Sequence, residues 1–416
     1  MKTQVFYPVV ICIIITITTS CTKNDDSKII KDPIPIVLSA SENKIAVSDK
    51  SFAINLFSTV CKNDSDNENI MISPFSLSSA LAMVWNGTDA LTKTSIQNTL
   101  GFEGYSDSEV NGYFKKLRES LIATDPSLKL AIANSIWYRK GAKINDVFSQ
   151  TNKNSYNAHI QGIDFSSPST ASTINNWCSN NTNGLINNVA KEISPDALLC
   201  LINALYFKGE WKSGYDFDKK ETIEGAFTCD NGKTVTAQMM NNVKAINFLE
   251  DPTLSAITLP YGNGAFDMVI ILPKPDISIN QVIDTLNKGS YWANMSKEWR
   301  LAIVKMQIPR FKFKFEIELN NTLRSMGMSN AFDALTANFS KAFIDKNFYI
   351  SLVKQFTYID LNEKGTEAAA ISLITAVSSP GLPKSVNFTA NHPFIFAIKE
   401  NSTGCILFIG KVGNPV

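Results

Sequence analysis

The chain has 416 residues, of which 44% are hydrophobic and 19% charged, and 39 basic residues nearly balance 38 acidic ones. This composition is typical of a globular protein that is long enough for a large core. The net charge of +1 gives no support for a nucleic-acid partner. With only two histidines, and with no cysteine pair at zinc-binding spacing, the sequence also excludes a His-rich metal site.

The N-terminal residues 1–20 are predicted to be a signal peptide. They contain a lysine and the apolar run 9–19 (VVICIIITITT), which is too short to span a bilayer comfortably. Three small residues precede Cys21, a pattern similar to a bacterial lipoprotein signal, in which the new N-terminal cysteine carries lipid. The alternative is a plain secretory signal with an incidental cysteine. We expect an exported outer-membrane or cell-surface lipoprotein, lipidated at Cys21, with residues 21–46 as its tether.

Five cysteines remain after the predicted signal and lipid site: Cys61, Cys178, Cys200, Cys229 and Cys405. An odd number at wide spacing does not form a disulfide framework, even in an exported chain. We therefore expect buried thiols that pack as small apolar side chains.

The first elements are predicted to be helices. Residues 48–61 (SDKSFAINLFSTVC) place apolar side chains four apart, behind Ser48 or Asp49 as a cap. Pro74 opens a second helix at its first turn, and residues 111–123 (NGYFKKLRESLIA) form a third.

The middle and the C-terminal part are predicted to be strands. Residues 130–138 (LAIANSIWY) and 198–207 (LLCLINALYF) are apolar enough to be buried on both faces. Residues 226–240 and 254–273 each read as a hairpin. Further strands are expected at residues 301–315, 349–362, 386–388, 394–399 and 406–412. Helices come mainly first and strands mainly later, which favours an α+β fold over repeated βαβ units.

Signatures of catalysis are weak. A Ser-His-Asp triad would need His159, which lies in a polar stretch, or His392, which precedes Pro393 and fits a structural role better. No G-x-S-x-G elbow occurs. Gly225 and residues 232–234 enclose six residues where a phosphate loop requires four. We predict that the protein is not an enzyme and needs neither a cofactor nor a metal.

The segment 366–379 (TEAAAISLITAVSS) is unusual because it carries a single charge. Laid out as a strand, it has one small, uncharged face that begins with Thr366, whereas Glu367 lies on the other face. No proline occurs before Pro380, so every backbone N–H can donate. Such a strand could enter a gap in a sheet. The alternatives are an Ala/Ser-rich loop or a helix, which three alanines favour.

The run 363–370 (EKGTEAAA) resembles the hinge of inhibitory serpins, a family of protease inhibitors. Other segments resemble the family in the expected order: residues 69–87 with a Ser-Pro-x-Ser motif, 203–211 (NALYFKGEW), 388–398 (FTANHPFIFAI) and 408–415 (FIGKVGNP). The resemblance extends over roughly residues 47–416.

This resemblance implies roles for individual residues. The hinge would consist of Glu363, Gly365, Thr366, Glu367, Ala368, Ala369 and Ala370. The contacts called shutter and breach, which hold the central sheet, would involve Ser73, Ser76, Asn203, Gln355 and Trp211. The family usually has a histidine at the position of Gln355. Glutamine can both donate and accept hydrogen bonds, so a network with Ser73 and Asn203 can form without the pH dependence of histidine.

The implied fold is α+β, with three β-sheets, about eight or nine helices, an exposed reactive loop and a metastable starting state. The implied function is inhibition of a protease by a monomer. The protease would cut the loop and form an acyl-enzyme, and the freed loop would then insert as a new central strand.

Family spacing places the reactive bond after Ser379, but the following Pro380 is poorly tolerated by most serine proteases. Cleavage one or two residues earlier stays open, within the window Ala376, Val377, Ser378, Ser379 and Pro380. No lysine or arginine occurs in residues 366–383, which disfavours trypsin-like targets. Elastase- or subtilisin-like enzymes fit better, and papain-like cysteine proteases are compatible.

Two other functions compete with inhibition. A non-inhibitory serpin, acting as a surface binding or carrier protein, would be indicated by bulky, charged or proline residues in the hinge, and this hinge has none. A surface glycan-binding lipoprotein rests on the signal alone. The basic residues Lys115, Lys116 and Arg118 are interpreted as a solvated helix face rather than a polyanion site.

Overall fold

The computed structural model describes residues 32–185, 193–344, 347–366 and 384–416. The predicted signal peptide, Cys21 and the start of the tether lie outside these residues. So do Glu367 and the alanines 368–370 of the hinge, together with the predicted cleavage window, residues 376–380.

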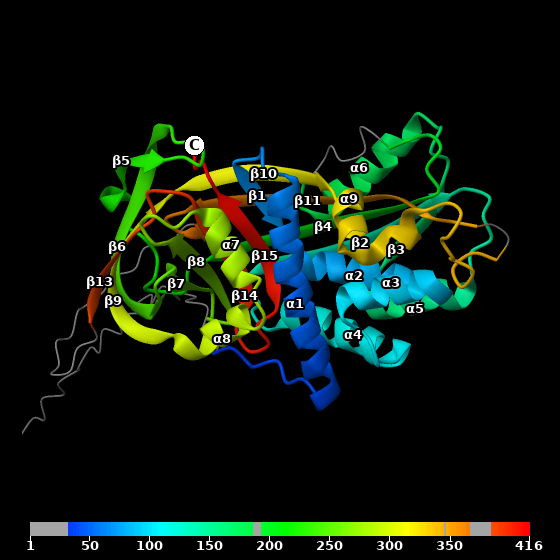
Figure 1. The fold of residues 1–416 in the computed structure, drawn as a ribbon, viewed down its shortest axis with the longest axis horizontal. Coiled ribbons are helices and arrows are strands. Elements are labelled where there is room, and N and C mark those ends of the chain that lie inside the picture. The colour runs from blue at the N-terminus through cyan, green and yellow to red at the C-terminus, as the bar shows by residue number, and fades with distance from the viewer. Residues whose placement is uncertain (1–31, 186–192, 345–346, 367–383) are drawn as a thin grey trace, which may run out of the picture. The chain divides into compact units, whose positions relative to one another are not determined.

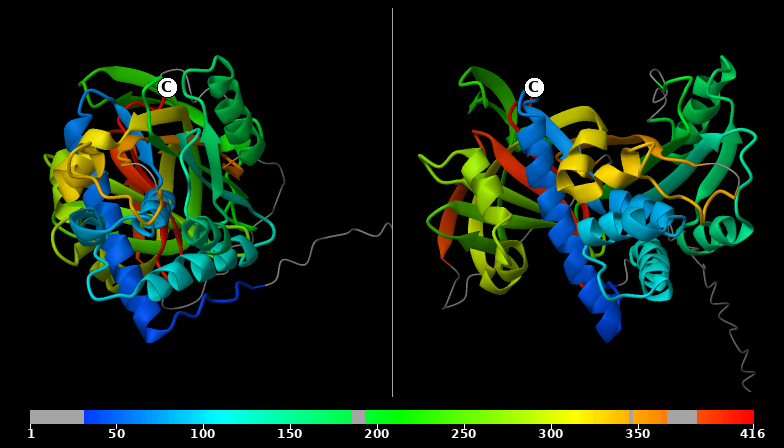
Figure 2. Two further views of the ribbon diagram at one scale, coloured as in Figure 1. Left: turned by 90° about the vertical axis from the view of Figure 1, so that its right-hand side faces the viewer. Right: turned by 45° about the vertical axis from the view of Figure 1, so that its right-hand side comes forward.

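The described residues form nine α-helices: α1 (Ala40–Asn63), α2 (Pro74–Trp85), α3 (Ala90–Leu100), α4 (Asp107–Ala123), α5 (Asp146–Tyr156), α6 (Ser169–Asn181), α7 (Ile279–Leu286), α8 (Tyr291–Glu298) and α9 (Asn320–Leu323). This agrees with the expected eight or nine. In Figures 1 and 2, α2 to α5 gather at the end that carries β2 and β3, and α1 crosses the middle.

Fifteen strands occur in the same residues. They are β1 (Asn69–Ile72), β2 (Lys129–Arg139), β3 (His159–Ile163), β4 (Leu199–Glu210), β5 (Ile223–Thr228), β6 (Thr234–Glu250), β7 (Leu254–Tyr261), β8 (Phe266–Pro273), β9 (Arg300–Pro309), β10 (Phe311–Glu318), β11 (Ile350–Asn362), β12 (Gly365–Thr366), β13 (Ser385–Thr389), β14 (Phe394–Glu400) and β15 (Ile406–Val412). Both predicted hairpins are present, as β5–β6 and β7–β8.

Hydrogen bonding groups these strands into a nine-stranded sheet and a six-stranded sheet, which confirms the α+β class. The larger sheet has the order β1-β15-β14-β8-β7-β6-β9-β13, with β5 also paired to β6, and the smaller has the order β10-β11-β12-β4-β2-β3. The expected third sheet is continuous with the larger one among the described residues. The cause is β6, whose 17 residues pair with β5 and β9 along most of their length and with β7 at the end.

The first helix begins earlier than the sequence analysis predicted. Its start is Ala40 rather than Ser48, because Ser39 and Glu42 form a capping box. The last residues of the expected tether therefore belong to α1, and Ile45 is fully buried. Ile36 is anchored as well, since its N–H donates to Ser402 Oγ at 2.8 Å.

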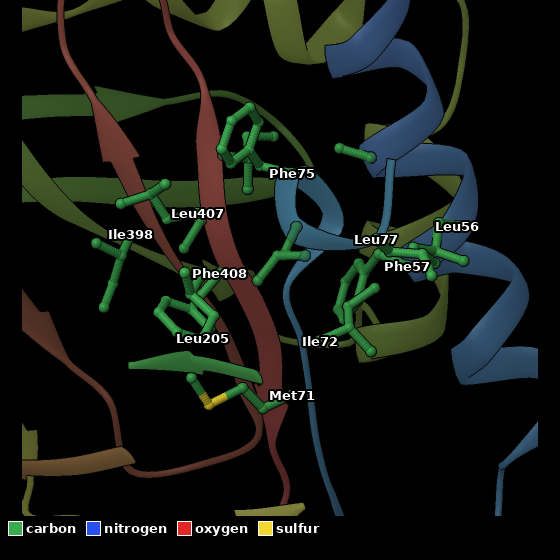
Figure 3. Close-up of a cluster of buried hydrophobic side chains, with 14 of the residues drawn as sticks. Leu56, Phe57, Met71, Ile72, Phe75, Leu77, Leu205, Ile398, Leu407 and Phe408 are labelled. Carbon is green, nitrogen blue, oxygen red and sulfur yellow. The ribbon is translucent and has the colours of Figure 1, made fainter. Parts of the chain in front are cut away.

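The main core contains side chains from both sheets and from every described α-helix except α6. All twelve residues of α2 are buried. Figure 3 shows Phe75 and Leu77 of α2 among side chains from α1, β4 and β15, including Leu56, Leu205 and Phe408. A helix buried on all sides needs no polar face, and α2 contains no charged residue.

The five cysteines after residue 31 are free and buried, as expected. Burial raises the pKa of the Cys61, Cys178 and Cys200 thiols to about 12, so they are not reactive thiolates at neutral pH. Within the described ranges, no helix is long and apolar enough to cross a membrane, and no cluster of side chains could hold a metal ion.

Asp49 of α1 predicts a specific pH dependence of stability. Its carboxyl is buried, accepts a hydrogen bond from Tyr113 Oη at 3.2 Å, and has a pKa that burial raises to about 6. The unfolded chain loses this proton near pH 4, so the native state binds it more tightly. Native stability should therefore fall by about 3 kcal/mol as the pH rises from 4 through 6.

Asp49→Asn should remove this loss. We expect the variant to have a higher urea midpoint than the parent at pH 7.5 and a similar midpoint at pH 4, measured by tryptophan fluorescence. A difference between the two proteins that is the same at both pH values would contradict this assignment.

Candidate functional site

The centre of the six-stranded sheet is only partly closed. Strands β4 and β11 run parallel and pair directly from Leu199 and Ile350 up to Ala204 and Phe356. Beyond this point the two strands do not pair with each other, and the two residues of β12 lie between them. Among the described residues, the site is therefore a slot between two central strands, and β12 occupies one end of it.

The register on both sides of the slot is the same. Gln355 lies opposite Asn203, an offset of 152 residues. Across Thr366, Leu361 lies opposite Gly209, which is again an offset of 152. A strand that continues from β12 would thus need β4 and β11 to separate sideways, without sliding along each other.

The hinge residue Gly365 is in a conformation that only glycine adopts readily. Its φ is +122°, and a Cβ atom would lie 2.4 Å from the carbonyl oxygen of Gly209 and 2.8 Å from the backbone N of Trp211. Both contacts are with backbone atoms, which cannot turn aside. Glycine is therefore what allows the chain to enter between the strands here.

Thr366 faces the core, as the alternation of the predicted strand requires. Its side chain is 4% exposed, and its hydroxyl lies 2.9 Å from the hydroxyl of Tyr261. Burial raises the pKa of Tyr261 well above its usual value, so this phenol stays protonated and can donate. The first residue of the inward face is thus already seated in the sheet.

Glu363 fixes the turn before β12. Its buried carboxylate accepts a hydrogen bond from Thr222 Oγ1 at 2.8 Å and lies 3.6 Å from Arg310 Nε. Its backbone carbonyl accepts from Phe217 N–H at 2.8 Å. The hinge is therefore tied to the chain just before β5 and to the end of β9.

Trp211, the residue predicted to belong to the breach, follows the end of β4. Its indole stacks on Tyr261 with ring centroids 4.5 Å apart and an interplanar angle of 18°. Its Nε1–H donates to the carbonyl of Asn362 at 3.3 Å, and its backbone N–H donates to the carbonyl of Lys364 at 2.9 Å. The same side chain thus supports Tyr261 beneath Thr366 and holds the end of β11.

The shutter residues lie together below the slot. Gln355 Oε1 accepts from Ser73 N–H at 2.8 Å, and its Nε2 donates to Ser73 C=O at 2.9 Å and to Asn203 Oδ1 at 3.0 Å. Asn203 Nδ2 in turn donates to Ser76 and to Asn134 of β2. The expected link between Gln355 and Ser73 uses the serine backbone, because the buried Ser73 hydroxyl has no hydrogen-bond partner in the described part of the chain.

Neither histidine forms a catalytic arrangement with the described residues. His159 packs against Trp137 and Trp177, with ring centroids 4.9 and 5.8 Å apart, and its Nε2 lies 2.9 Å from Gln161 Oε1. The ring nitrogens of His392 lie close to Asn391 Oδ1 and to the carbonyl of Pro273.

Sequence reasoning did not assign Thr222, Tyr261, Arg310 or Asn134 to this site. Tyr261 and Arg310 stand in the motifs Leu259-Pro260-Tyr261 and Ile308-Pro309-Arg310, which also resemble the family, but the motifs alone assign no contact to either residue. Thr222 and Asn134 carry no local signal, because their role depends on pairing between distant segments.

Comparison with known proteins gives consistent matches. The family model Serpin, described as serine protease inhibitor, matches residues 47–415. The chain is 31% identical over 394 residues to Serpin B11 of Homo sapiens, covering 89% of this chain and 99% of the relative. It is also 31% identical to leukocyte elastase inhibitor of Homo sapiens, covering 89% of this chain and 100% of that protein.

Among solved structures, a thermophilic serpin, tengpin, in the native state superimposes with a TM-score of 0.83. It is 32% identical, and the match covers 92% of this chain and 97% of tengpin. The family-model match includes the slot, the breach and the shutter described above.

Proposed function

Because the chain belongs to the serpin family, we propose that it inhibits a protease by acting as a suicide substrate. The observation that carries this proposal is β12, which already pairs with β4 on one side and β11 on the other. The hinge therefore lies where a new strand would enter the sheet. Because the register of β4 and β11 matches on both sides, the two strands could separate to admit it without sliding past each other.

In this mechanism the target protease supplies the nucleophile. Its serine attacks a loop carbonyl, the amine of the C-terminal fragment leaves, and an acyl-enzyme forms. The freed loop then enters between β4 and β11 faster than water releases the protease. Fourteen residues at about 3.4 Å each make a strand of about 48 Å, so the attached protease is carried across the body.

Continued in the register of β12, the inserted strand would bring residue 372 between Gln355 and Asn203. The Gln355–Asn203 hydrogen bond would then have to break, and this chain offers Ser372 at that position. A serine hydroxyl can both donate and accept, so it can replace the lost bond on either side. Each of the other inserted residues would add ladder hydrogen bonds, which is the source of the driving force.

The proposed target is an elastase- or subtilisin-like serine protease. The loop contains no lysine or arginine before residue 384, which disfavours trypsin-like specificity. The similarity to leukocyte elastase inhibitor supports the same class. We infer that the inhibitor acts as a monomer and that papain-like cysteine proteases are a secondary target.

The test is to mix the purified protein with pancreatic elastase, subtilisin, papain and trypsin. We expect a covalent complex with elastase or subtilisin that survives boiling in detergent, because the link is an ester. Mass spectrometry of the released C-terminal peptide should place its start between Val377 and Pro380. If no enzyme forms such a complex, or if the cut lies outside the window, this function is wrong.

We also propose that the mature protein is anchored to a bacterial outer membrane or cell surface by lipid on Cys21. The support is the sequence pattern before this cysteine and the polar segment after it. Cys21→Ala should move the protein from the membrane fraction to the soluble fraction of the producing cells. Unchanged membrane association of this variant would refute the anchor, and Cys12→Ala is the matched control.

A further inference from the structure

The side chain of Gln355 links β11 to strand β4 and to the residue that precedes helix α2. Its side chain is 1% exposed, and its amide makes three hydrogen bonds, two to the backbone of Ser73 and one to Asn203. Both of its N–H groups are used, and its oxygen accepts one bond. The amide thus joins β11 to β4 and to the N-terminus of α2 at the point where strand entry must separate the sheet.

The three partners require two donors and one acceptor from one side chain. A neutral primary amide supplies this set, whereas neutral imidazole has one donor and one acceptor, and imidazolium has two donors and no acceptor. A histidine would therefore leave one buried bond unmade in either state. An isosteric glutamate offers one donor when protonated and none when ionised.

Among the described elements packed against Gln355, none presents an ionisable side chain to it. Helix α2 and strand β1 contain none. In β4, β10 and β11, every ionisable residue has an even number, and the paired Gln355, Asn203 and Ile317 have odd numbers, so these groups point to the opposite face. On that face, Lys354 forms an ion pair with Glu316. In β2, whose Asn134 shares the face of Gln355, Tyr138 lies toward the strand end, packed against Phe343.

We propose that Gln355 is a positioning residue that makes the parting of β4 and β11 independent of pH between about 5 and 8. This is the range in which a histidine changes charge. The link to inhibition rests on the proposed function, whereas the three hydrogen bonds of Gln355, which we call the latch, are a property of the sheet itself. The consequence is that the contribution of this side chain to holding the sheet closed is the same at acidic and neutral pH.

The test compares Gln355→His and Gln355→Glu with the parent by hydrogen exchange of residues 199–204 and 350–356. Protection in each variant is divided by protection in the parent at the same pH, which cancels other titrating groups such as Asp49. We expect the His variant to lose at least tenfold more protection at pH 5.5 than at pH 8, because imidazolium turns a donor toward Ser73 N–H. The Glu variant should show the opposite trend, because its carboxylate turns acceptors toward Ser73 C=O and Asn203 Oδ1.

The matched control is Lys354→His, which places the same titratable group one residue away on the opposite face. Its protection relative to the parent should not change with pH by more than about twofold. Ratios of the His and Glu variants that are flat with pH, or that change no more than the ratio of Lys354→His, would overturn the proposed role of Gln355. Failure of the parent to inhibit any protease would refute the proposed function and leave these exchange data decisive for Gln355.

A variant without hydrogen-bonding groups at the same position completes the design. Gln355→Met keeps the length of the side chain without a strong donor or acceptor, so it should lower protection at every pH by the same factor. If Met lowers protection no more than the Lys354→His control does, the three hydrogen bonds do not hold the sheet, and the proposal is wrong.

Discussion

Thr366→Arg is expected to turn the inhibitor into a substrate that the protease cuts and leaves. The side chain of Thr366 lies inside the sheet against Tyr261, so arginine there must bury an unpaired guanidinium or force β12 out of the slot. The desolvation penalty is on the order of several kcal/mol. Because insertion competes with deacylation, and each ~1.4 kcal/mol slows insertion about tenfold, the protease should escape.

The measurement is the number of moles of inhibitor consumed for each mole of protease silenced, which we expect to rise at least tenfold. Cleavage of the loop should persist, because the predicted window, residues 376–380, is some ten residues away. Glu367→Arg is the control, since alternation places residue 367 on the other face. Normal inhibition by Thr366→Arg, or an equal defect in Glu367→Arg, would show that the alternating-face argument is wrong.

Gly365→Ala is expected to lower both the stability of the native state and the efficiency of inhibition. Alanine is strained at a φ of +122°, and its Cβ would meet three backbone atoms of residues 209–211 at less than 3.0 Å. Strain of this kind costs about 1–3 kcal/mol before the clash is counted. The hinge should therefore leave the slot, which lowers the urea midpoint of the native state and also raises the stoichiometry of inhibition.

Gly232→Ala provides a matched control for backbone strain. Gly232 also has a positive φ, +79°, at the tip of the β5–β6 hairpin, but a Cβ atom there would meet nothing within 4 Å. We expect a smaller loss of stability than for Gly365→Ala and an unchanged stoichiometry of inhibition. Equal effects of the two substitutions on both measurements would mean that the close approach to Gly209 is unimportant.

Much of this site could be predicted from local patterns. Period-two alternation correctly placed Thr366 toward the core, because a strand has only two faces. The apolar runs that became β2 and β4 were identified as strands buried on both faces for the same reason. The partners of Gln355, Ser73 and Asn203, came from the family resemblance rather than from a local pattern, and Gln355 does form hydrogen bonds with the backbone of Ser73 and with Asn203.

Other features depend on pairing between distant segments and left no local signal. The two described residues of β12 pair with both β4 and β11, which is possible only because these two strands diverge at this end. The contact of Thr222 with Glu363 joins residues 141 positions apart. Two sheets form rather than three because the 17-residue strand β6 is long enough to pair with β5, β9 and β7 within one sheet.

The start of α1 was missed for a different reason. The capping box Ser39–Glu42 was visible in the sequence, but the mixed polar composition of residues 22–46 favoured a tether. Buried Ile36 and Ile45, which pack against the core, decide the outcome, and burial is not a local property.

The central claim is that the freed loop fills the slot between β4 and β11, and hydrogen exchange of residues 357–360 tests it most directly. In the described chain, these residues pair with β10 but not with β4. After cleavage within residues 376–380, the amides that point away from β10 should exchange at least tenfold more slowly, and the cleaved protein should melt at a higher temperature than the intact one. Unchanged exchange in this stretch, with a cleaved protein that melts like the intact one, would contradict the account.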